Sequence, residues 1–356
     1  MRVLGLTRYA NAGASSRLRS LQYGPALAAA GITVVWRPLF DDRYIRDLYE
    51  RRRKSLVLVA GAYAKRIGAL LTSRRSDLVW LEKESLPWLP SWLDPGLLRL
   101  GPPYVVDYDD AVFHYYDQSR SAQVRKLLGH KIDAVMRHAA LVVAGNPYLA
   151  ARARQAGARR VEIIPTVIDL QRYTPREETA KSGITVGWIG SPSTQKMIQG
   201  LVPVLARCLD PVTDRLVTVG ARFEKPLMPN HEMRPWSEAT EVEEIRRFDI
   251  GVMPLVDQPF ERGKCGYKLI QYMACGVPVV ASPVGVNTDI VQSGVNGFLA
   301  ADDEAWGRAI RELKADAGMR RRMGAAGRAL VERQYCLQVT APRLIGLLQQ
   351  VAASNK

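Results

Sequence analysis

The sequence is poor in the residues from which metal centres and disulfide frameworks are built. It holds four histidines and four cysteines in 356 residues, and no two cysteines form a Cys-x-x-Cys pair. The cysteines are Cys208, Cys265, Cys275 and Cys336. This spacing is not that of a metal-ligand cluster, and reduced thiols are the default state for such a chain. We therefore expect no metal site and a cytoplasmic protein.

Long apolar runs are also missing. The longest, residues 55–64, is shorter than the roughly 20 residues that a membrane-spanning helix needs. The N-terminal sequence MRVLGLTRYA reads directly as a strand, without the apolar region or the cleavage site of a signal peptide. We therefore expect no signal peptide and no membrane crossing.

Acidic residues are outnumbered by 35 to 50, which leaves a net charge of +15. Such a charge suits nucleic acid, an anionic membrane surface or a phosphorylated substrate. Residues 43–75 alone carry ten basic and two acidic residues, and there RRRK precedes the apolar and basic segment SLVLVAGAYAKRIGALL. That segment is suited to an anionic bilayer surface, with Trp88 and Trp92 as interfacial anchors, or else to a buried helix with a solvated basic end. No nucleic-acid-binding motif accompanies it, so nucleic acid is the less favoured partner.

Strand-like apolar runs alternate with helical patterns along most of the chain. They span residues 3–7, 32–38, 77–81, 104–107, 141–144, 161–165, 184–189, 215–219, 249–254 and 279–281. This alternation predicts an α/β fold with parallel strands, in which ligands bind at the carboxyl ends of the strands.

The stretch from residue 260 to residue 282 combines a glycine-containing loop, a helix and a strand. We predict a helix over 267–274, ended by Gly276, with Leu269, Ile270 and Met273 facing the core. Two ammonium groups and an amide then share the other side, from Lys264, Lys268 and Gln271. Above a glycine loop and a helix N-terminus, at Gly266, these groups suit a diphosphate and a ribose. A merely solvated helix face would look similar.

Two further turns in the second half are candidates for the same ligand. Gly190, Ser191, Ser193 and Thr194 lie between a strand and a helix, where phosphate oxygens can be received. The signal is weak, because neither a GxGxxG nor a Walker pattern is present. Asn287 and Thr288, after Gly285, are predicted to cap another helix start, either at the same anion or as ordinary caps with nothing bound.

In the first half, the loop RYANAGASSRLRS contains Gly13, Ser15 and Ser16, and either serine is a predicted helix cap. Arg17 and Arg19 begin that helix, either as exposed side chains or as groups that meet an acceptor or a phosphate.

The segment VVDYDDAVFH ends another strand with carboxylates. Asp107, Asp109 and Asp110 are placed there for substrate hydroxyls or for acid–base work, with helix capping by Asp110 as the alternative.

These motifs, together with LVVAGNPYLA, IIPTVID and KLIQYMACGVPVVASPVGVNTDIVQSGVNGFL, resemble the bacterial retaining glycosyltransferases of family 4. The resemblance covers nearly the whole chain and is strongest over residues 184–299. It implies the GT-B fold, which has two Rossmann-like domains with parallel sheets facing across a cleft. We place them at residues 1–170 for the acceptor and 183–335 for the donor, with a linker over 171–182 and a C-terminal helix over 336–356 that we expect to pack back on the first domain.

The resemblance also implies the chemistry. A nucleoside-diphosphate sugar would be the donor, with neither a catalytic metal nor a further cofactor. Lys264 and Lys268 would neutralise the leaving diphosphate held at Gly190 and Gly266, and Asp109 would face the sugar or the acceptor. The loop from Gly13 to Arg19 would meet the acceptor.

One departure from the family concerns two glutamates eight positions apart. In this sequence Gly263 and Gln271 occupy those positions, and Glu261 lies two residues from the first. Gln271 can still hydrogen-bond a ribose.

These observations favour a hexosyltransferase-like enzyme that extends a bacterial surface polysaccharide, such as lipopolysaccharide or another glycolipid, at the inner face of the cytoplasmic membrane. A sugar-nucleotide epimerase of the same architecture would differ by releasing an altered sugar without an acceptor. A non-catalytic nucleic-acid-binding protein would lose affinity steeply with salt.

Overall fold

The computed structural model describes residues 1–49, 56–176 and 182–354. The chain forms two compact units. Unit 1 consists of Met1–Thr166, Gly263–Cys265 and Thr340–Lys356, and unit 2 of Val167–Arg262 and Gly266–Val339. The basic run RRRK and part of the predicted linker lie outside the described residues.

Unit 1 is built on a parallel sheet of six strands. They are β1 (Arg2–Leu6), β2 (Thr33–Trp36), β3 (Leu78–Glu82), β4 (Tyr104–Tyr108), β5 (Leu141–Ala144) and β6 (Val161–Ile163). Their order is β2-β1-β3-β4-β5-β6, so the direction of strand addition reverses between β1 and β3. In open α/β sheets, ligands bind at the carboxyl ends of the strands beside such a reversal.

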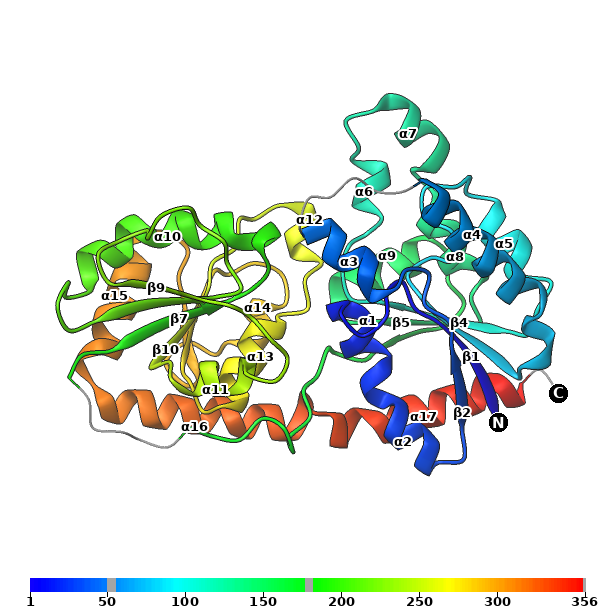
Figure 1. Cartoon of the computed structure of the whole chain (residues 1–356). Helices are drawn as coiled ribbons and strands as arrows, with labels where there is room; N and C mark the ends of the chain where they lie inside the picture. The colour runs from blue at the N-terminus through cyan, green and yellow to red at the C-terminus, as the bar shows by residue number, and fades with distance from the viewer. Residues whose placement is uncertain (50–55, 177–181, 355–356) are drawn as a thin grey trace. The chain divides into compact units, whose positions relative to one another are not determined.

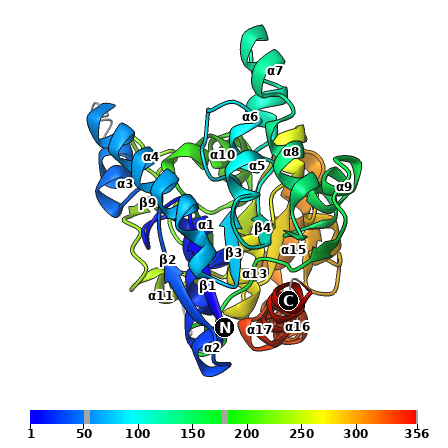
Figure 2. The same ribbon diagram turned by 90° about the vertical axis from the view of Figure 1, so that its right-hand side faces the viewer.

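Helices cover both faces of this sheet (Figure 1). They are α1 (Ala14–Arg19), α2 (Gly24–Ala29), α3 (Asp42–Tyr49), α4 (Leu56–Leu71), α5 (Leu93–Leu98), α6 (His114–Asp117), α7 (Ala122–Leu128), α8 (Lys131–His138), α9 (Pro147–Gln155) and most of α17 (Leu337–Ala353). Adjacent helices in the row α4, α5, α8 and α9 contact one another, whereas a 3.0 Å hydrogen bond between the Tyr23 and Thr340 hydroxyls ties α17 to the segment before α2. Helix α7 stands away from the rest of the unit (Figure 2).

Unit 2 contains the second parallel sheet. Its strands are β7 (Thr185–Ile189), β8 (Arg215–Val219), β9 (His231–Arg234), β10 (Ile250–Met253), β11 (Val279–Ala281) and β12 (Gly297–Leu299), in the order β12-β11-β10-β7-β8-β9. Strand order here reverses between β7 and β10, as in dinucleotide-binding folds. We did not predict β9 or β12, because one is mostly polar and the other has three residues.

Two apolar cores flank the second sheet. The helices of this unit are α10 (Gln195–Cys208), α11 (Glu241–Arg246), α12 (Pro259–Arg262), α13 (Tyr267–Ala274), α14 (Asn287–Ile290), α15 (Asp303–Ala315) and α16 (Ala317–Gln334). Side chains of α10 and α15 form one core, and those of α11, α13 and α16 form the other. Alternate strand residues enter opposite cores: Val280 contributes to the first, and Val279 and Ala281 to the second.

Helix α13 spans residues 267–274, as predicted, and Gly276 follows it with a φ of 70°. Leu269, Ile270 and Met273 are completely buried, which confirms their predicted core positions. Burial of each such side chain stabilises a fold by about 1.5–3 kcal/mol. Helix α16 packs so closely against α13 at Gly327 that a Cβ there would lie 2.8 Å from Met273 Cγ.

Within the part of the chain that the structure describes, no helix is both long and apolar enough to cross a bilayer.

Candidate functional site

Tyr272 of α13 contacts both β7 and β10, the strands between which the strand order of unit 2 reverses. Its hydroxyl accepts a 3.0 Å hydrogen bond from Ile189 N at the end of β7 and lies 3.4 Å from Val252 O of β10. The Tyr272 ring crosses Gly251, where a Cβ would come within 2.4 Å of it. Helix α13 is therefore fixed beside the two strands between which a ligand crevice is expected.

Gly190 is the first residue after β7 and packs against the turn that follows β8. A Cβ on Gly220 would lie 2.5 Å from Gly190 O, and Gly220 has a φ of 83°. Lys268 reaches the same place, because its Cε lies 3.0 Å from the position that a Cβ on Gly190 would take. Its ammonium lies 5.5 Å from the Trp188 ring centroid, within cation–π range. The structure thus brings the predicted donor residues Gly190 and Lys268 together.

Helix α13 begins at this place without a side-chain cap. Its N-cap, Gly266, has a φ of 65° and no side chain that could accept from the first N–H groups. Helix α10 also starts here, after a short turn in which the Ser191 and Ser193 hydroxyls lie 2.7 Å apart and Thr194 Oγ1 donates to Ser191 O. Two helix N-termini of unit 2 therefore present backbone hydrogen-bond donors and positive dipole ends.

The third helix start that we predicted is not capped by its side chains. Helix α14 has four residues with Val286 as N-cap, and no cap hydrogen bond forms. Asn287 is buried and its Nδ2 donates to Ser282 O at 3.0 Å, whereas Thr288 Oγ1 donates to Gly285 O. The capping prediction was wrong because both side chains turn back to carbonyl groups that precede the helix.

Gln271 does not share an exposed helix side with Lys268, contrary to our prediction. It is 3% exposed, and its Nε2 donates to the Tyr173 hydroxyl at 2.8 Å. The same hydroxyl donates to Glu241 Oε1 at 2.8 Å, and Trp236 Nε1 donates to Glu241 Oε2 at 2.9 Å. A helical wheel could not reveal this, because Tyr173 and Glu241 come from distant parts of the sequence.

The segment Gly263–Cys265 packs with unit 1, and Lys264 is therefore described there. Asn146 Nδ2 donates to Gly263 O at 2.9 Å and to Lys264 O at 3.1 Å. A Cβ on Gly263 would lie 2.5 Å from Ala111 Cβ and 2.8 Å from Ala111 N. This close approach gives a steric reason for glycine at a position where the resembled family has glutamate.

At the strand reversal of unit 1, a buried lysine holds two predicted residues together. Lys83 follows β3 directly and adopts a φ of 62°, a conformation that is uncommon outside glycine. Its ammonium lies 2.9 Å from Asp109 Oδ1 and donates to Ser15 Oγ at 3.0 Å. The structure thus joins the predicted catalytic Asp109 to the predicted acceptor residue Ser15.

Lys83 and Asp109 each stabilise the charged form of the other. Burial alone would raise the pKa of Asp109, but the Lys83 ammonium holds it below its ordinary value. Burial would lower the pKa of Lys83, but the neighbouring carboxylates, Asp109 first, raise it. Asp109 is therefore a carboxylate at neutral pH, suited to orienting a hydroxyl or a positive centre rather than to storing a proton.

Other predicted acceptor residues serve the fold of unit 1. Arg17 and Arg19 are buried rather than exposed, and the N-cap of α1 is Gly13, without a serine cap. Arg19 donates to both oxygens of Asp107, at 2.7 and 2.9 Å, and also to a backbone carbonyl, Ile164 O. Arg17 donates to Asn11 O, and Ser16 Oγ donates to Glu82 Oε2.

The alternative role of Asp110, as a helix cap, is not found, since α6 starts at His114 with Phe113 as N-cap. The His114 imidazole lies 2.8 Å from Asp117 Oδ1 and 2.9 Å from the Tyr148 hydroxyl.

Sequence reasoning missed the charged residues that end β3. Glu84 lies 3.5 Å from Arg8 and 3.8 Å from Lys131, and burial raises the pKa of Glu84. The run Glu82-Lys83-Glu84 after an apolar strand was the available signal, because charges at a carboxyl strand end mark a candidate site.

No cluster of three or more histidine, cysteine, aspartate or glutamate side chains suited to a metal ion occurs within residues 1–49, 56–176 and 182–354.

Unit 2 is similar in sequence to known glycosyltransferases. Residues 183–316 match the family described as Glycosyl transferases group 1. The D-inositol 3-phosphate glycosyltransferase of Geodermatophilus obscurus is 28% identical over 206 residues, which are 48% of this chain and 45% of that protein. That of Frankia alni is 31% identical over 160 residues, covering 43% and 34%. The chain thus spans about half or less of the length of these curated relatives.

Solved structures are similar over the whole chain. Sucrose-phosphate synthase from Thermosynechococcus elongatus has a TM-score of 0.74 at 19% identity, covering 99% of this chain and 100% of that one. Anabaena HepE in complex with UDP and glucose has a TM-score of 0.73 at 18% identity, covering 98% and 100%. The chain therefore has the two-domain GT-B fold, and its residues 183–316 match the group 1 glycosyl transferases.

Proposed function

We propose that the protein is a retaining glycosyltransferase that uses a nucleoside-diphosphate sugar. The observation that carries this proposal is the convergence of Gly190, Lys268 and the N-terminus of α13 beside the strand reversal of a region that matches the group 1 glycosyl transferases. A structural neighbour was solved in complex with UDP-glucose, which favours UDP among the nucleotides to test.

In the proposed reaction an acceptor hydroxyl attacks the anomeric carbon as the bond to the diphosphate breaks. Electron density moves to the leaving diphosphate, where Lys268 and the helix N-termini stabilise the developing charge. The acceptor oxygen bonds on the face that the diphosphate leaves, and its proton passes to an oxygen of the leaving diphosphate. The anomeric configuration is therefore retained.

We assign the acceptor to the crevice of unit 1. Ser15, Lys83 and Asp109 form a polar, charged group suited to sugar hydroxyls. The proposed acceptor is a glycan or a lipid-linked glycan of a bacterial surface polysaccharide. D-inositol 3-phosphate should also be tested as an acceptor, because the curated relatives are named D-inositol 3-phosphate glycosyltransferase.

Thermal unfolding with UDP, GDP and ADP at matched ionic strength tests the donor site. A nucleotide at about 100 times its dissociation constant should stabilise the protein by roughly 2.7 kcal/mol. Lys268→Ala should abolish turnover and keep the fold. Arg308→Ala, which removes an exposed side chain of α15 in the same unit, should not alter the rate. An unchanged rate in Lys268→Ala would remove that residue from the site. Release of an altered sugar without an acceptor would instead indicate an epimerase.

We also propose that transfer needs no metal ion, because Lys268 and the helix N-termini supply positive charge at the diphosphate. Incubation with EDTA should leave the initial rate unchanged. Restoration of a lost rate by Mg²⁺ or Mn²⁺ would contradict this proposal.

A peripheral membrane position is proposed from exposed apolar side chains of unit 1. Leu56, Val57 and Leu58 at the start of α4 are exposed, as are Trp88 and Trp92. A 2.7 Å hydrogen bond from the Tyr63 hydroxyl to a backbone carbonyl, Pro87 O, connects α4 to the Trp88 loop. Apolar anchors of this kind insert at a bilayer interface.

Cosedimentation with phosphatidylglycerol vesicles should be weakened by the double change Trp88→Ser and Trp92→Ser. Val212→Ser, which alters an exposed side chain of unit 2, is the control. Equal binding by all three proteins would exclude this surface.

A further inference from the structure

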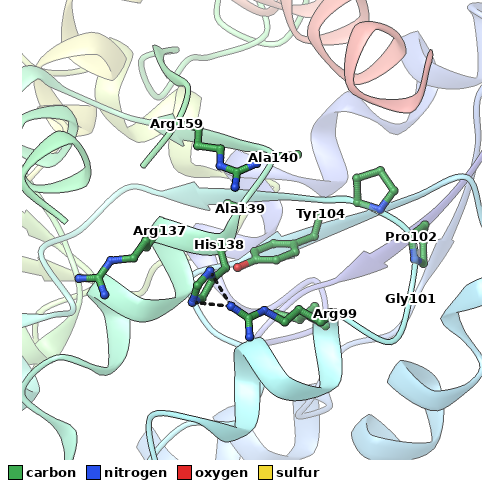
Figure 3. A pocket seen from close by; sticks show the side chains of 11 residues that line it. Arg99, Gly101, Pro102, Tyr104, Arg137, His138, Ala139, Ala140 and Arg159 are labelled. Carbon is green, nitrogen blue, oxygen red and sulfur yellow. Dashed lines mark hydrogen bonds between the residues drawn. The ribbon is translucent and has the colours of Figure 1, made fainter. Parts of the chain in front are cut away.

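A cavity of about 370 Å³ opens in unit 1 at the amino ends of β4 and β5 (Figure 3). Its lining includes Tyr104, the first residue of β4, and Ala140, which directly precedes β5. Asp109 follows the other end of β4, and five strand residues span roughly 16 Å. The cavity is therefore distinct from the proposed acceptor crevice.

Three arginines from three elements line this cavity, which we call the arginine pocket. Arg99 follows α5, Arg137 lies in the last turn of α8, and Arg159 precedes β6. Neither an aspartate nor a glutamate lines it. Within the described part of the chain, no ion pair links these three guanidinium groups to a carboxylate.

The three arginines are exposed, and they make few hydrogen bonds within the described part of the chain. Arg99 donates to the imidazole of His138 at 3.0 Å, drawn as dashed lines in Figure 3, and Arg137 Nε donates to Ala156 O at 2.9 Å. No nitrogen of the Arg159 guanidinium has a hydrogen-bond partner among the residues that the structure describes. Desolvation and the three guanidinium groups lower the pKa of His138, so the imidazole is neutral at pH 7.

Ordinary helix termini do not account for this charge. The helix dipoles favour cations at the C-termini of α5 and α8, but each C-terminus carries only about −0.5 of a charge. Against three guanidinium groups, two termini leave a surplus of about two positive charges. A phosphate monoester carries about −1.5 to −2 at pH 7 and accepts paired hydrogen bonds from arginine.

The shape of the pocket limits the size of its ligand. Leu98, Pro102, Pro103 and Tyr104 give it an apolar wall beside the arginines. Its volume lies at the lower end of the range for small-molecule sites, about 300–1,000 Å³. We propose that the arginine pocket binds the phosphate monoester of a small metabolite. This inference does not depend on the proposed function.

Calorimetry with inorganic phosphate and with glucose 6-phosphate, at constant ionic strength, tests the proposal. We expect saturable binding of one ligand per chain. The double change Arg99→Gln and Arg159→Gln should weaken it at least about tenfold, because charge-assisted hydrogen bonds to the phosphate are lost. Arg154→Gln removes an exposed arginine outside the pocket and should bind as the wild type does. If the double variant fails to fold, the single change Arg159→Gln replaces it in the test, because the Arg159 side chain has no described partner.

Crossed variants separate this site from the donor site. Lys268→Ala should still bind phosphate, and the arginine-pocket variant should still be stabilised by UDP. Phosphate binding that survives the arginine changes, or that disappears in Lys268→Ala, would overturn the proposal, as would the lack of saturable binding. Phosphatidic acid vesicles test a lipid source of the phosphate group, and binding to vesicles without binding to either soluble phosphate would overturn a metabolite site.

Discussion

The two units share an architecture but place different chemistry where their strand order reverses. In unit 1 the carboxyl strand ends carry buried ion pairs, among them Lys83 with Asp109 and Arg19 with Asp107. In unit 2 the corresponding ends carry glycine turns at Gly190 and Gly220, with Lys268 beside the first.

This difference shows what each crevice can receive. At its strand reversal, unit 1 pairs Lys83 and Arg19 with carboxylates and offers fixed polar groups to a hydroxyl-bearing ligand. Unit 2 offers backbone donors, helix N-termini and the Lys268 ammonium, groups that favour an anionic ligand. Such a division fits the proposed acceptor in one unit and the proposed diphosphate donor in the other.

The largest expected effect comes from breaking a buried pair of unit 1. Arg19→Ala leaves the Asp107 carboxylate buried without its partner, which should lower the free energy of unfolding by about 3–5 kcal/mol. Arg207→Ala in unit 2 removes an exposed partner of Asp303 and should cost at most about 1 kcal/mol. Urea unfolding measures both. Similar losses in the two variants would contradict the contrast between the units.

A methyl group at Gly190 should test the glycine turn of unit 2. It would meet the Trp188 ring at 2.6 Å and Lys268 Cε at 3.0 Å, so Gly190→Ala should abolish the stabilisation of roughly 2.7 kcal/mol expected from saturating nucleotide. Gly200→Ala is the matched control, because Gly200 lies in α10 with no atom close to its Cβ position. That control should keep the nucleotide response and gain about 0.4–1 kcal/mol. A full response in Gly190→Ala would place the nucleotide elsewhere.

The Lys83–Asp109 pair predicts a pH dependence for unit 1. Because the folded-state pKa of Asp109 is lowered, its stabilising contribution is present above the unfolded pKa of about 3.9 and is lost as pH falls through the folded value. Asp109→Asn should therefore lose less stability than wild type between about pH 5 and pH 2. Glu304→Gln, at an exposed carboxylate of unit 2, should follow the wild-type curve. The measurement is the melting temperature of each protein across this pH range. Parallel curves of melting temperature against pH for Asp109→Asn and wild type would count against the ion pair.

The smallest effect concerns the thiols, for which the two units should behave alike. Burial raises the pKa of Cys265 in unit 1 and of Cys275 in unit 2 to about 12, from an ordinary 9.0. Both thiols should resist iodoacetamide at pH 8 in the folded protein and react once urea unfolds it. Because unfolded thiols ionise first, stability should fall as pH rises from about 9 towards 12. Rapid labelling of native Cys265 would show that its surroundings open.

Most of the fold could be predicted from local sequence, and the exceptions have physical reasons. The apolar run at 279–281 and the spacing of Leu269, Ile270 and Met273 set β11 and α13 correctly, because burial on a regular element leaves a periodic pattern. β9 escaped prediction since HEMR has little apolar character of its own and pairs with β8 through its backbone.

Site residues were less accessible to prediction than core residues. The proximity of Gly190 and Lys268 was predictable, because glycine turns and lysines at helix starts have a local meaning. The surroundings of Gln271 and the pairing of Lys83 with Asp109 depend on contacts between segments far apart in the sequence. Periodicity carries no information on such contacts.

The return of α17 to unit 1 has a consequence for biosynthesis. Arg343 in this helix lies 2.9 Å from Glu162, and Arg160 donates to Gln350, so unit 1 is completed by residues made after all of unit 2. At roughly 5–20 residues per second, the ribosome needs on the order of 10–30 s to pass from Thr166 to Thr340. During that interval the nascent first sheet lacks one covering helix, which makes it a natural client for chaperones that hold exposed apolar surface.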